Sequence, residues 1–207
     1  FLKEGDAVFK DFVQVVNKEQ DISVLAQCVF NLPNKVIIFE DDKRPNDEYI
    51  NLAPSYNLMS ISDYSKFGTI GAFYCFKPVG TKFATVLSNR GCRARCTFCS
   101  VRNFNGPGVR IRSIDSIIDE LELLREKYEI GHIMWLDDDL FKDHKRVIRL
   151  FDEMARRNLD MTWDATNGVI AASCTDEVID AAAKSGCIAL NIGMESGNPD
   201  ILRKIVK

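Results

Sequence analysis

The sequence lacks the features that mark exported and membrane-bound proteins. No apolar run approaches the roughly 18 residues of a membrane span, and no secretory signal opens the chain. The 7 cysteines are an odd number, which together with the missing signal argues against a disulfide framework. These absences exclude a membrane-spanning segment and favour a protein of the reducing cytoplasm, so a cytoplasmic location is the expectation.

An excess of charge of one sign is also missing. The 27 basic and 30 acidic residues leave a net charge of −3, which gives no reason to expect nucleic-acid binding. The hydrophobic share of 46% and the charged share of 28% are ordinary for a globular domain. We therefore expect a small-molecule or other unidentified substrate. The chain starts at Phe1 rather than methionine and ends within a helical pattern at "ILRKIVK", which predicts a fragment with missing portions at both ends.

From Phe83 onward the sequence alternates between short apolar runs and helical periodicity. The apolar runs start near residues 83, 132, 161 and 187, and each is followed by apolar residues at helical spacing. Consecutive βα units imply a parallel sheet with right-handed crossovers. The predicted fold class is therefore α/β, with about four units of a partial (β/α)6 TIM-like barrel over residues 83–207. The fourth run, "CIALNIGM", predicts a strand that is buried on both faces.

The first part of the chain has a different pattern. Residues 1–40 predict a helix followed by a β-hairpin, which together form the tail of a small α/β domain. Residues 41–82 are irregular and rich in aromatic side chains, among them Phe73, Tyr74 and Phe76. A free linker would carry fewer aromatics, so this segment predicts a linker that wraps over a neighbouring surface.

The segment "RGCRARCTFCS" carries Cys92, Cys96 and Cys99 directly after the first predicted strand of the barrel. The carboxyl ends of parallel strands are where α/β proteins place their chemistry. Three thiolates can hold three irons of a cubane iron–sulfur cluster and leave the fourth iron open to a ligand. A structural zinc site wants four ligands, and a ferredoxin-type run needs a fourth nearby cysteine. The triplet therefore favours an open-site cluster over these alternatives.

The cysteine spacing, C-x3-C-x-aromatic-C with Phe98 as the aromatic residue, resembles the signature of the radical S-adenosylmethionine (SAM) enzymes. The resemblance implies a [4Fe–4S] cluster on Cys92, Cys96 and Cys99, with SAM chelating the open iron. It further implies reductive cleavage of SAM to a 5′-deoxyadenosyl radical, and an electron donor such as flavodoxin or ferredoxin. Phe98 would shield the cluster, and its backbone would lie along the adenine.

Two further stretches extend this resemblance to residues 83–207. "WLDDDLF" matches an acidic motif of some family members, and adjacent buried carboxylates are stabilised by a cationic ligand. Asp137 and Asp138 are therefore candidates for binding the SAM ammonium group, against the alternative of solvated or helix-capping acids. Asp139 replaces the asparagine of the family motif, which leaves its role open. In "IGMESGNPDIL", Glu195 is a candidate for the SAM ribose or ammonium, or otherwise a carboxylate at a helix N-terminus.

Residues 1–80 carry a second, less specific resemblance. "FLKEGDAVFKDFVQVV" resembles the end of a cobalamin-binding domain, and "LAPSYNLMSISDYSKFG" resembles the linker that joins such a domain to a radical SAM barrel. Cobalamin is therefore a candidate cofactor, although its ligating D-x-H-x-x-G motif does not occur in residues 1–207 and its site would lie mostly outside them.

The sequence as a whole predicts a radical SAM enzyme of the cobalamin-associated type, which methylates or rearranges an unactivated carbon. A cobalamin-independent radical SAM enzyme, of the methylthiotransferase or cyclase kind, is the first alternative. A non-catalytic iron–sulfur or zinc module is the second. No catalytic residue, substrate or oligomeric state follows from the sequence, and Asp164, Thr166 and Asn167 are only candidate contacts at the end of the third strand.

Overall fold

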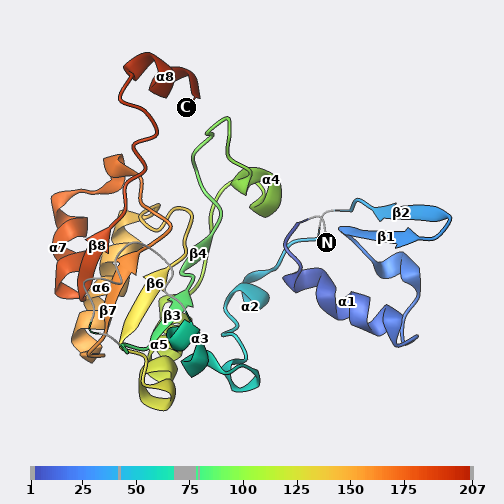
Figure 1. The fold of residues 1–207 in the computed structure, drawn as a ribbon, viewed down its shortest axis with the longest axis horizontal. Helices are drawn as coiled ribbons and strands as arrows, with labels where there is room; N and C mark the ends of the chain where they lie inside the picture. The colour runs from blue at the N-terminus through green and yellow to red at the C-terminus, as the bar shows by residue number, and fades with distance from the viewer. Residues whose placement is uncertain (1–2, 42, 68–77, 79, 206–207) are drawn as a thin grey trace.

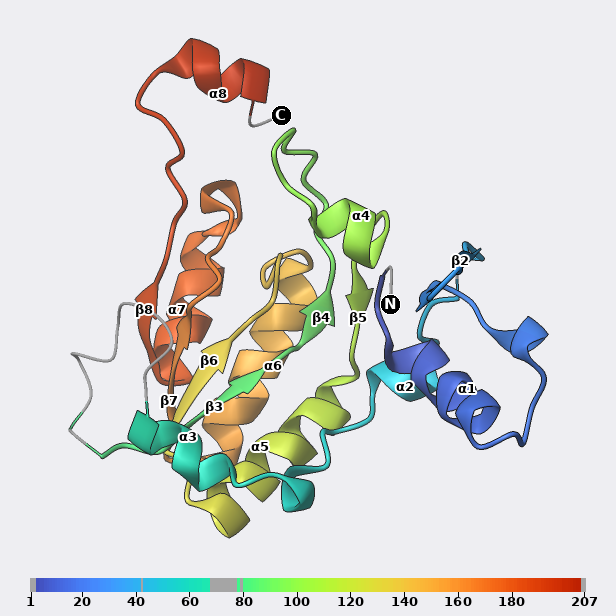
Figure 2. The same cartoon turned by 45° about the vertical axis from the view of Figure 1, so that its right-hand side comes forward.

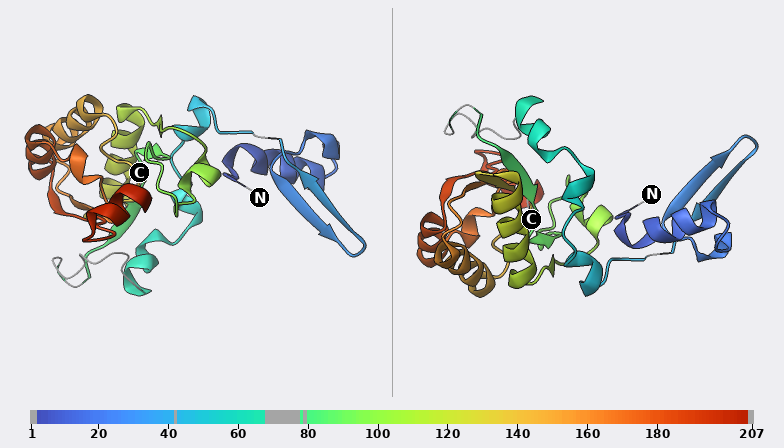
Figure 3. Two further views of the ribbon diagram at one scale, coloured as in Figure 1. Left: turned by 90° about the horizontal axis from the view of Figure 1, so that it is seen from above. Right: turned by 90° about the horizontal axis from the view of Figure 1, so that it is seen from below.

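The computed structural model describes residues 3–41, 43–67, 78 and 80–205. At the N-terminal end, helix α1 (Asp6–Val16) and a 3-10 turn (Ile22–Val24) precede strands β1 (Cys28–Leu32) and β2 (Lys35–Phe39). The two strands pair antiparallel as a hairpin. This confirms the predicted helix and hairpin, and Figures 1 and 3 show them at one end of the molecule, away from the main sheet.

The linker forms short helices that cover part of the barrel. Helix α2 (Asp47–Ile50), a 3-10 turn (Tyr56–Leu58) and helix α3 (Ile61–Phe67) lead to the main sheet. Ile50, Tyr56 and Ile61 are buried, and the Tyr56 hydroxyl donates a hydrogen bond to the buried carboxylate of Glu120. The described part of residues 41–82 therefore packs against the core, and its role as a linker between two domains stays a prediction. Phe73, Tyr74 and Phe76 lie outside the described residues.

A parallel sheet of four strands forms the centre of the fold. Its order is β3 (Phe83–Val86), β6 (His132–Trp135), β7 (Thr162–Ala165) and β8 (Cys187–Leu190). All three pairings are parallel, and they follow the order of the chain. Between β3 and the first long helix, β4 (Asn89–Arg90) and β5 (Arg110–Ile111) form a short antiparallel ribbon. This confirms the α/β class and the partial barrel of four βα units.

Helices follow the strands as the periodicity predicts. They are α4 (Val101–Asn105), α5 (Ile114–Tyr128), α6 (His144–Arg157), α7 (Asp176–Lys184) and α8 (Pro199–Ile205), with a 3-10 turn at Ala171–Ser173. The side chains of Ser113, Asp143 and Thr175 cap α5, α6 and α7 by accepting from a backbone N–H three residues on. No helix in the described part of the chain is both long and apolar enough to cross a membrane.

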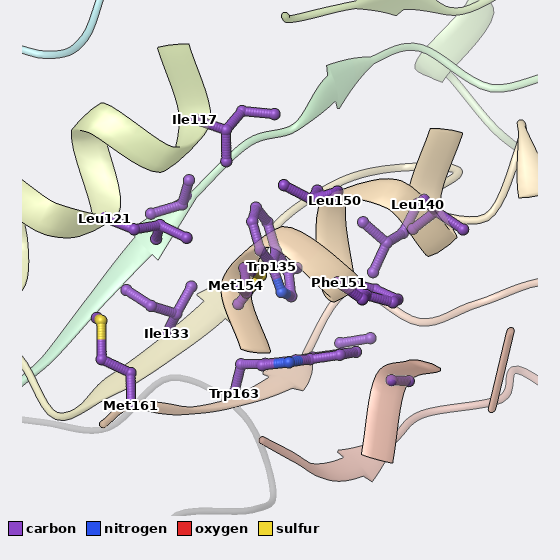
Figure 4. Close-up of a cluster of buried hydrophobic side chains, with 14 of the residues drawn as sticks. Ile117, Leu121, Ile133, Trp135, Leu140, Leu150, Phe151, Met154, Met161 and Trp163 are labelled. Atoms are coloured by element: carbon purple, nitrogen blue, oxygen red, sulfur yellow. The ribbon is translucent and has the colours of Figure 1, made fainter. Parts of the chain in front are cut away.

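The main hydrophobic core lies between the sheet and helices α5 to α7 (Figure 4). The rings of Trp163 and Phe151 stack with centroids 4.8 Å apart, and Trp135 meets Trp163 edge-on at 6.4 Å. Side chains alternate along a strand, so His132 and Asp164 belong to the opposite face of the sheet from Trp135 and Trp163. The Nε2 atom of His132 lies 2.8 Å from Oδ2 of Asp164, which makes a buried polar pair on that face.

The prediction for the fourth strand was wrong in one respect. β8 ends at Leu190, and none of its residues is fully buried. Further along, Ile192 and Met194 are 49% and 74% exposed. Within the described residues β8 pairs only with β7, so its other edge and part of its faces stay open to solvent. Apolar composition predicts a strand correctly here, but burial also needs a neighbour on each side.

Candidate functional site

The three cysteines of the predicted cluster site lie on one loop between β4 and α4. Figure 2 shows this loop beyond the carboxyl ends of β3 and β6. Cys92 and Cys96 are partly exposed, Cys99 is exposed, and all three are free thiols. The structure therefore brings the triplet to the edge of the sheet at which the sequence analysis expected chemistry.

The other described cysteines have a different environment. The thiols of Cys28 and Cys187 donate to backbone carbonyls two residues away. The thiol of Cys174 donates to the backbone carbonyl of Ile170, four residues earlier. In contrast, the sulfur of Cys92 accepts a hydrogen bond from the backbone N–H of Ala94 at 3.4 Å. An accepting sulfur is the geometry that suits a thiolate ligand.

The donor set fits an iron–sulfur cluster better than a site for one ion. Among the described residues, no three His, Cys, Asp or Glu side chains converge closely enough to hold a single metal ion. Such convergence is not required of a cubane, because each cysteine binds a different iron. Burial raises the pKa of the Cys92 thiol, and the carboxylates of Asp139 and Asp138 raise it further. A positively charged metal centre would offset these effects on the thiolate.

Phe98 and Glu195 lie on two different connections at this edge of the sheet. Phe98 is on the cysteine loop, and its ring is 58% exposed. Glu195 is exposed in the segment between β8 and α8, where its backbone has a φ of 53°. Both side chains are accessible to a ligand, and their roles in SAM binding stay predictions.

The Asp137 side chain is buried, and its carboxylate is hydrogen-bonded within the fold. Its carboxylate is 1% exposed and accepts from the Ser88 backbone N–H at 2.9 and 3.1 Å and from Ser88 Oγ at 2.6 Å. Burial raises the pKa of Asp137 to about 6, although the Ser88 and Asn89 hydrogen bonds oppose that rise. The contact of Asp137 with the SAM ammonium stays a prediction, and these hydrogen bonds inside the fold argue against it.

Asp138 differs from its neighbours because it is only half-buried. Asn105 donates to its Oδ2 at 3.0 Å and Asn167 donates to its Oδ1 at 3.2 Å. Burial raises the pKa of the Asp138 carboxyl, and a hydrogen bond from the Gly91 backbone opposes the rise. Asp138 also lines a cavity of about 350 Å³ together with Leu87, Arg90, Phe104, Asn105 and Leu136. Of the three adjacent acids, Asp138 is the one that faces a space open to a ligand.

Asp139, whose role the sequence left open, binds the cysteine loop. Its Oδ2 lies 3.1 Å from Nε of Arg93 and accepts from the Arg93 backbone N–H at 3.3 Å. The Arg93 guanidinium also donates to the carbonyl of Lys142 and the hydroxyl of Ser173. Asp139 thus ties the residue next to Cys92 to the loop after β6.

The sequence analysis missed Ser88, Arg93 and Asn105 as contributors to the site. Arg93 stands beside a predicted ligand, which is a usable signal, but nothing in the sequence pairs it with Asp139. The candidate contact Thr166 donates to Asp164, which also lies within hydrogen-bond distance of His132. Asn167 instead donates to Asp138 and to the Leu136 carbonyl. The structure therefore brings Asn167 to the site.

The N-terminal segment reaches the same edge of the sheet through ion pairs. The buried carboxylate of Glu4 contacts Arg110 and lies 3.3 Å from Arg90, and Asp6 lies 2.6 Å from Arg90. Glu4, Gly5 and Asp6 complete the lining of the cavity that contains Asp138. The segment before α1 is thus fixed to the β4–β5 ribbon, next to the cysteine loop.

A parallel β/α sheet with three free cysteines on the loop after its first strand defines a class of iron–sulfur enzyme folds. The family model of the Radical SAM superfamily matches residues 86–207. The chain belongs to this superfamily, as the cysteine spacing predicted.

Two comparisons with individual proteins agree with that assignment. The chain is 28% identical to an uncharacterized methyltransferase of Pyrococcus horikoshii over 99% of the chain and 41% of that protein. It is 30% identical to the cytidylyl-2-hydroxyethylphosphonate methyltransferase of Streptomyces wedmorensis over 69% of the chain and 26% of that protein. The chain thus spans less than half the length of these relatives.

Among solved structures, the chain superposes on the cobalamin-dependent S-adenosylmethionine radical enzyme OxsB, solved with aqua-cobalamin and S-adenosylmethionine bound. The TM-score is 0.76, the identity is 19%, and the match covers 99% of the chain and 29% of OxsB. At this identity the similarity establishes a shared fold. It includes the N-terminal helix and hairpin as well as the sheet.

The pKa of Asp137 predicts a pH-dependent stability. The native carboxyl takes up a proton near pH 6, compared with 3.8 for a free aspartate, so the native state binds more protons between these values. The unfolding free energy therefore falls as the pH rises through this interval. In urea unfolding of the cluster-free protein, the stability of wild type relative to Asp137→Asn should fall by up to about 3 kcal/mol between pH 4 and pH 7.

A difference in unfolding free energy between wild type and Asp137→Asn that does not change with pH would contradict the raised pKa of Asp137. If Asp137→Asn does not fold, the same titration can be followed in the wild-type protein from the carboxyl ¹³C shift of Asp137, with a midpoint near pH 6 expected.

Gly91 predicts a steric limit on the cysteine loop. Its φ is 92°, and a Cβ atom there would lie 2.5 Å from the backbone oxygen of Gly108. Gly91→Ala should therefore displace the loop that carries Cys92 and destabilise the fold by about 1–3 kcal/mol. Urea unfolding and the iron content after reconstitution measure the two effects.

Gly80→Ala is the matched control, since Gly80 has a φ of 87° and a Cβ atom there would meet no atom of the described residues within 4 Å. It carries the backbone strain without the collision. If Gly91→Ala and Gly80→Ala lose equal amounts of unfolding free energy and iron content, the contact with Gly108 has no role.

Proposed function

We propose that the protein is a radical SAM enzyme that binds a [4Fe–4S] cluster through Cys92, Cys96 and Cys99. The observation that carries the proposal is the set of three free thiols on one loop at the carboxyl edge of the sheet, in a chain of the Radical SAM superfamily. When bound, the cluster supplies the electron that cleaves SAM to a 5′-deoxyadenosyl radical. The reaction outcome we propose is methylation, supported by the methyltransferase names of both relatives.

The chain's own residues would bind and orient SAM next to the cysteine loop. Asp138 is the proposed partner of the SAM ammonium group, because it is half-buried, lines the cavity of about 350 Å³ and keeps its carboxylate fixed by Asn105 and Asn167. Phe98 would cover the cluster side of the ligand, and Glu195 would accept from the ribose or ammonium. Arg90 and the N-terminal residues Glu4, Gly5 and Asp6 also line the cavity.

Cobalamin is the second proposed cofactor. In this proposal residues 1–40 are the end of a cobalamin-binding domain, residues 41–82 are the linker, and residues 83–207 are the radical SAM core. The shared fold with OxsB, which includes the N-terminal residues, supports it. The ion pairs of Glu4 with Arg90 and Arg110 would keep such a domain over the cysteine loop. A reductant such as flavodoxin or ferredoxin is the proposed electron donor, and a cytoplasmic location stays a prediction.

The cluster assignment predicts a specific product. After anaerobic reconstitution, the protein should hold about four irons per chain and form 5′-deoxyadenosine from SAM in the presence of dithionite. Replacing Cys92, Cys96 or Cys99 by alanine should abolish this product, because each thiolate holds one iron. Iron analysis and chromatography of the nucleoside products make the measurement.

Cys174→Ala is the matched control, because its thiol bonds to a carbonyl of its own segment. It should keep both the iron and the product. An intact cubane that forms no 5′-deoxyadenosine would refute the proposed activity, and a single bound zinc would refute the cluster.

The cobalamin proposal predicts that the full-length protein retains cobalamin through gel filtration. With SAM carrying a labelled methyl group, the label should appear in the product of a methylation. A full-length protein without cobalamin that still forms 5′-deoxyadenosine would favour the cobalamin-independent class instead. The absorption spectrum and mass spectrometry of the product distinguish these outcomes.

A further inference from the structure

The loop that carries the cysteines runs beside the loop after β6. Within the described residues, backbone-to-backbone hydrogen bonds do not pair these two loops as they pair β3 with β6. The last backbone hydrogen bond of the β3–β6 pair joins the Leu136 N–H to the Val86 carbonyl at 3.0 Å. Beyond it the two segments do not pair with each other among the described residues, and the first continues into β4, which pairs with β5. The connections that continue the pairing come from carboxylate side chains, which lie on the β6 side and accept from backbone N–H groups on the β3 side.

Asp137 forms the first of these connections. It accepts from the N–H and the hydroxyl of Ser88. The Ser88 carbonyl is held from the other side, by the Arg112 backbone N–H at 3.0 Å and by the Arg146 guanidinium at 2.9 Å. Every polar group of Ser88 is thus bonded to the surrounding fold, which fixes the point at which the chain leaves the sheet.

Asp138 accepts from the backbone of Gly91, which precedes Cys92. Asp139 forms the connection on the other side of that cysteine. It holds the backbone N–H and the guanidinium of Arg93, which follows Cys92 directly. Its own carbonyl accepts from Asn89 Nδ2 at 3.0 Å, so the contact runs in both directions between the segments. The Asp139 side chain is 1% exposed, which protects these hydrogen bonds from competition with water.

We propose that Asp137 and Asp139 are positioning residues that set the conformation of the cysteine loop before any metal binds. The proposal goes beyond the proposed function and concerns the loop in the cluster-free protein. A loop that is already ordered loses less conformational entropy when its three thiolates bind a cluster. Replacing either carboxylate by the amide removes the negative charge that strengthens its hydrogen bonds and leaves one accepting oxygen in place of two.

Hydrogen–deuterium exchange of the full, cluster-free protein tests the proposal. In the wild type, the amides of Ser88 and Arg93 should be protected without metal. Asp139→Asn should raise the exchange rate of the Arg93 amide at least about tenfold, and Asp137→Asn should do the same for Ser88. Amides of α5 and β6 should keep their rates in both variants. Asp119→Asn, a carboxylate exposed on α5, is the matched control and should change neither loop amide.

The rate of cluster assembly provides a second readout, which general destabilisation elsewhere in the fold would not change. Asp139→Asn should slow assembly about tenfold while the final absorption spectrum stays that of the wild type. Arg93→Ala removes the guanidinium but keeps the backbone N–H that Asp139 accepts, so it should slow assembly less than Asp139→Asn. The double variant should be about as slow as Asp139→Asn, because the guanidinium contact is shared by both residues.

Two results would overturn the proposal: an Arg93 amide that exchanges freely in the wild type, or an unchanged assembly rate in Asp139→Asn. Neither result bears on SAM cleavage. Conversely, a protein that assembles its cluster normally and forms no 5′-deoxyadenosine would refute the proposed function and leave this inference intact.

Discussion

The arrangement of the site depends on how two chain segments stay together after the sheet between them has ended. Backbone hydrogen bonds hold β3 and β6 in register up to Val86 and Trp135. Beyond that point a buried backbone N–H still needs a partner, because an unpaired one costs free energy. The carboxylates of Asp137 and Asp139 provide that partner without imposing strand geometry. The first segment is therefore free to form the loop that carries the cysteines.

The burial of these carboxylates costs free energy. Burial raises the pKa values of all three adjacent acids, and for Asp137 it outweighs the hydrogen bonds from Ser88 and the attraction of Arg146. Buried charge is therefore a weak source of stability here, as it is in proteins generally. The carboxylates instead fix the position of their partners. An aspartate side chain is short and follows the end of a buried strand, so the N–H group that it accepts from is held in one place. The core of Trp135, Trp163 and Phe151 stabilises the strands that carry them.

Features encoded by neighbouring residues could be predicted from the sequence. The periodicity predicted the four βα units, and the cysteine spacing identified the family. The errors concern partners distant in sequence. The burial of β8 depends on what lies beside it, and the partner of Asp139 is Arg93, 46 residues away. Adjacent acids indicated a site, but the N–H groups that reach them come from another βα unit.

The same geometry separates the roles of three residues that look alike in the sequence. Burial alternates along the triplet, since Asp137 and Asp139 are 1% and 2% exposed while Asp138 is half-buried. All three acids accept hydrogen bonds from the backbone between Ser88 and Arg93, and of the three Asp138 is the one that also lines the cavity of about 350 Å³. A cationic ligand there would meet one carboxylate that Asn105 and Asn167 already orient. The repulsion among neighbouring acids, which first suggested a cation, is reduced inside the fold by Arg93 and Arg146, and the binding of a ligand cation by Asp138 is part of the proposed function.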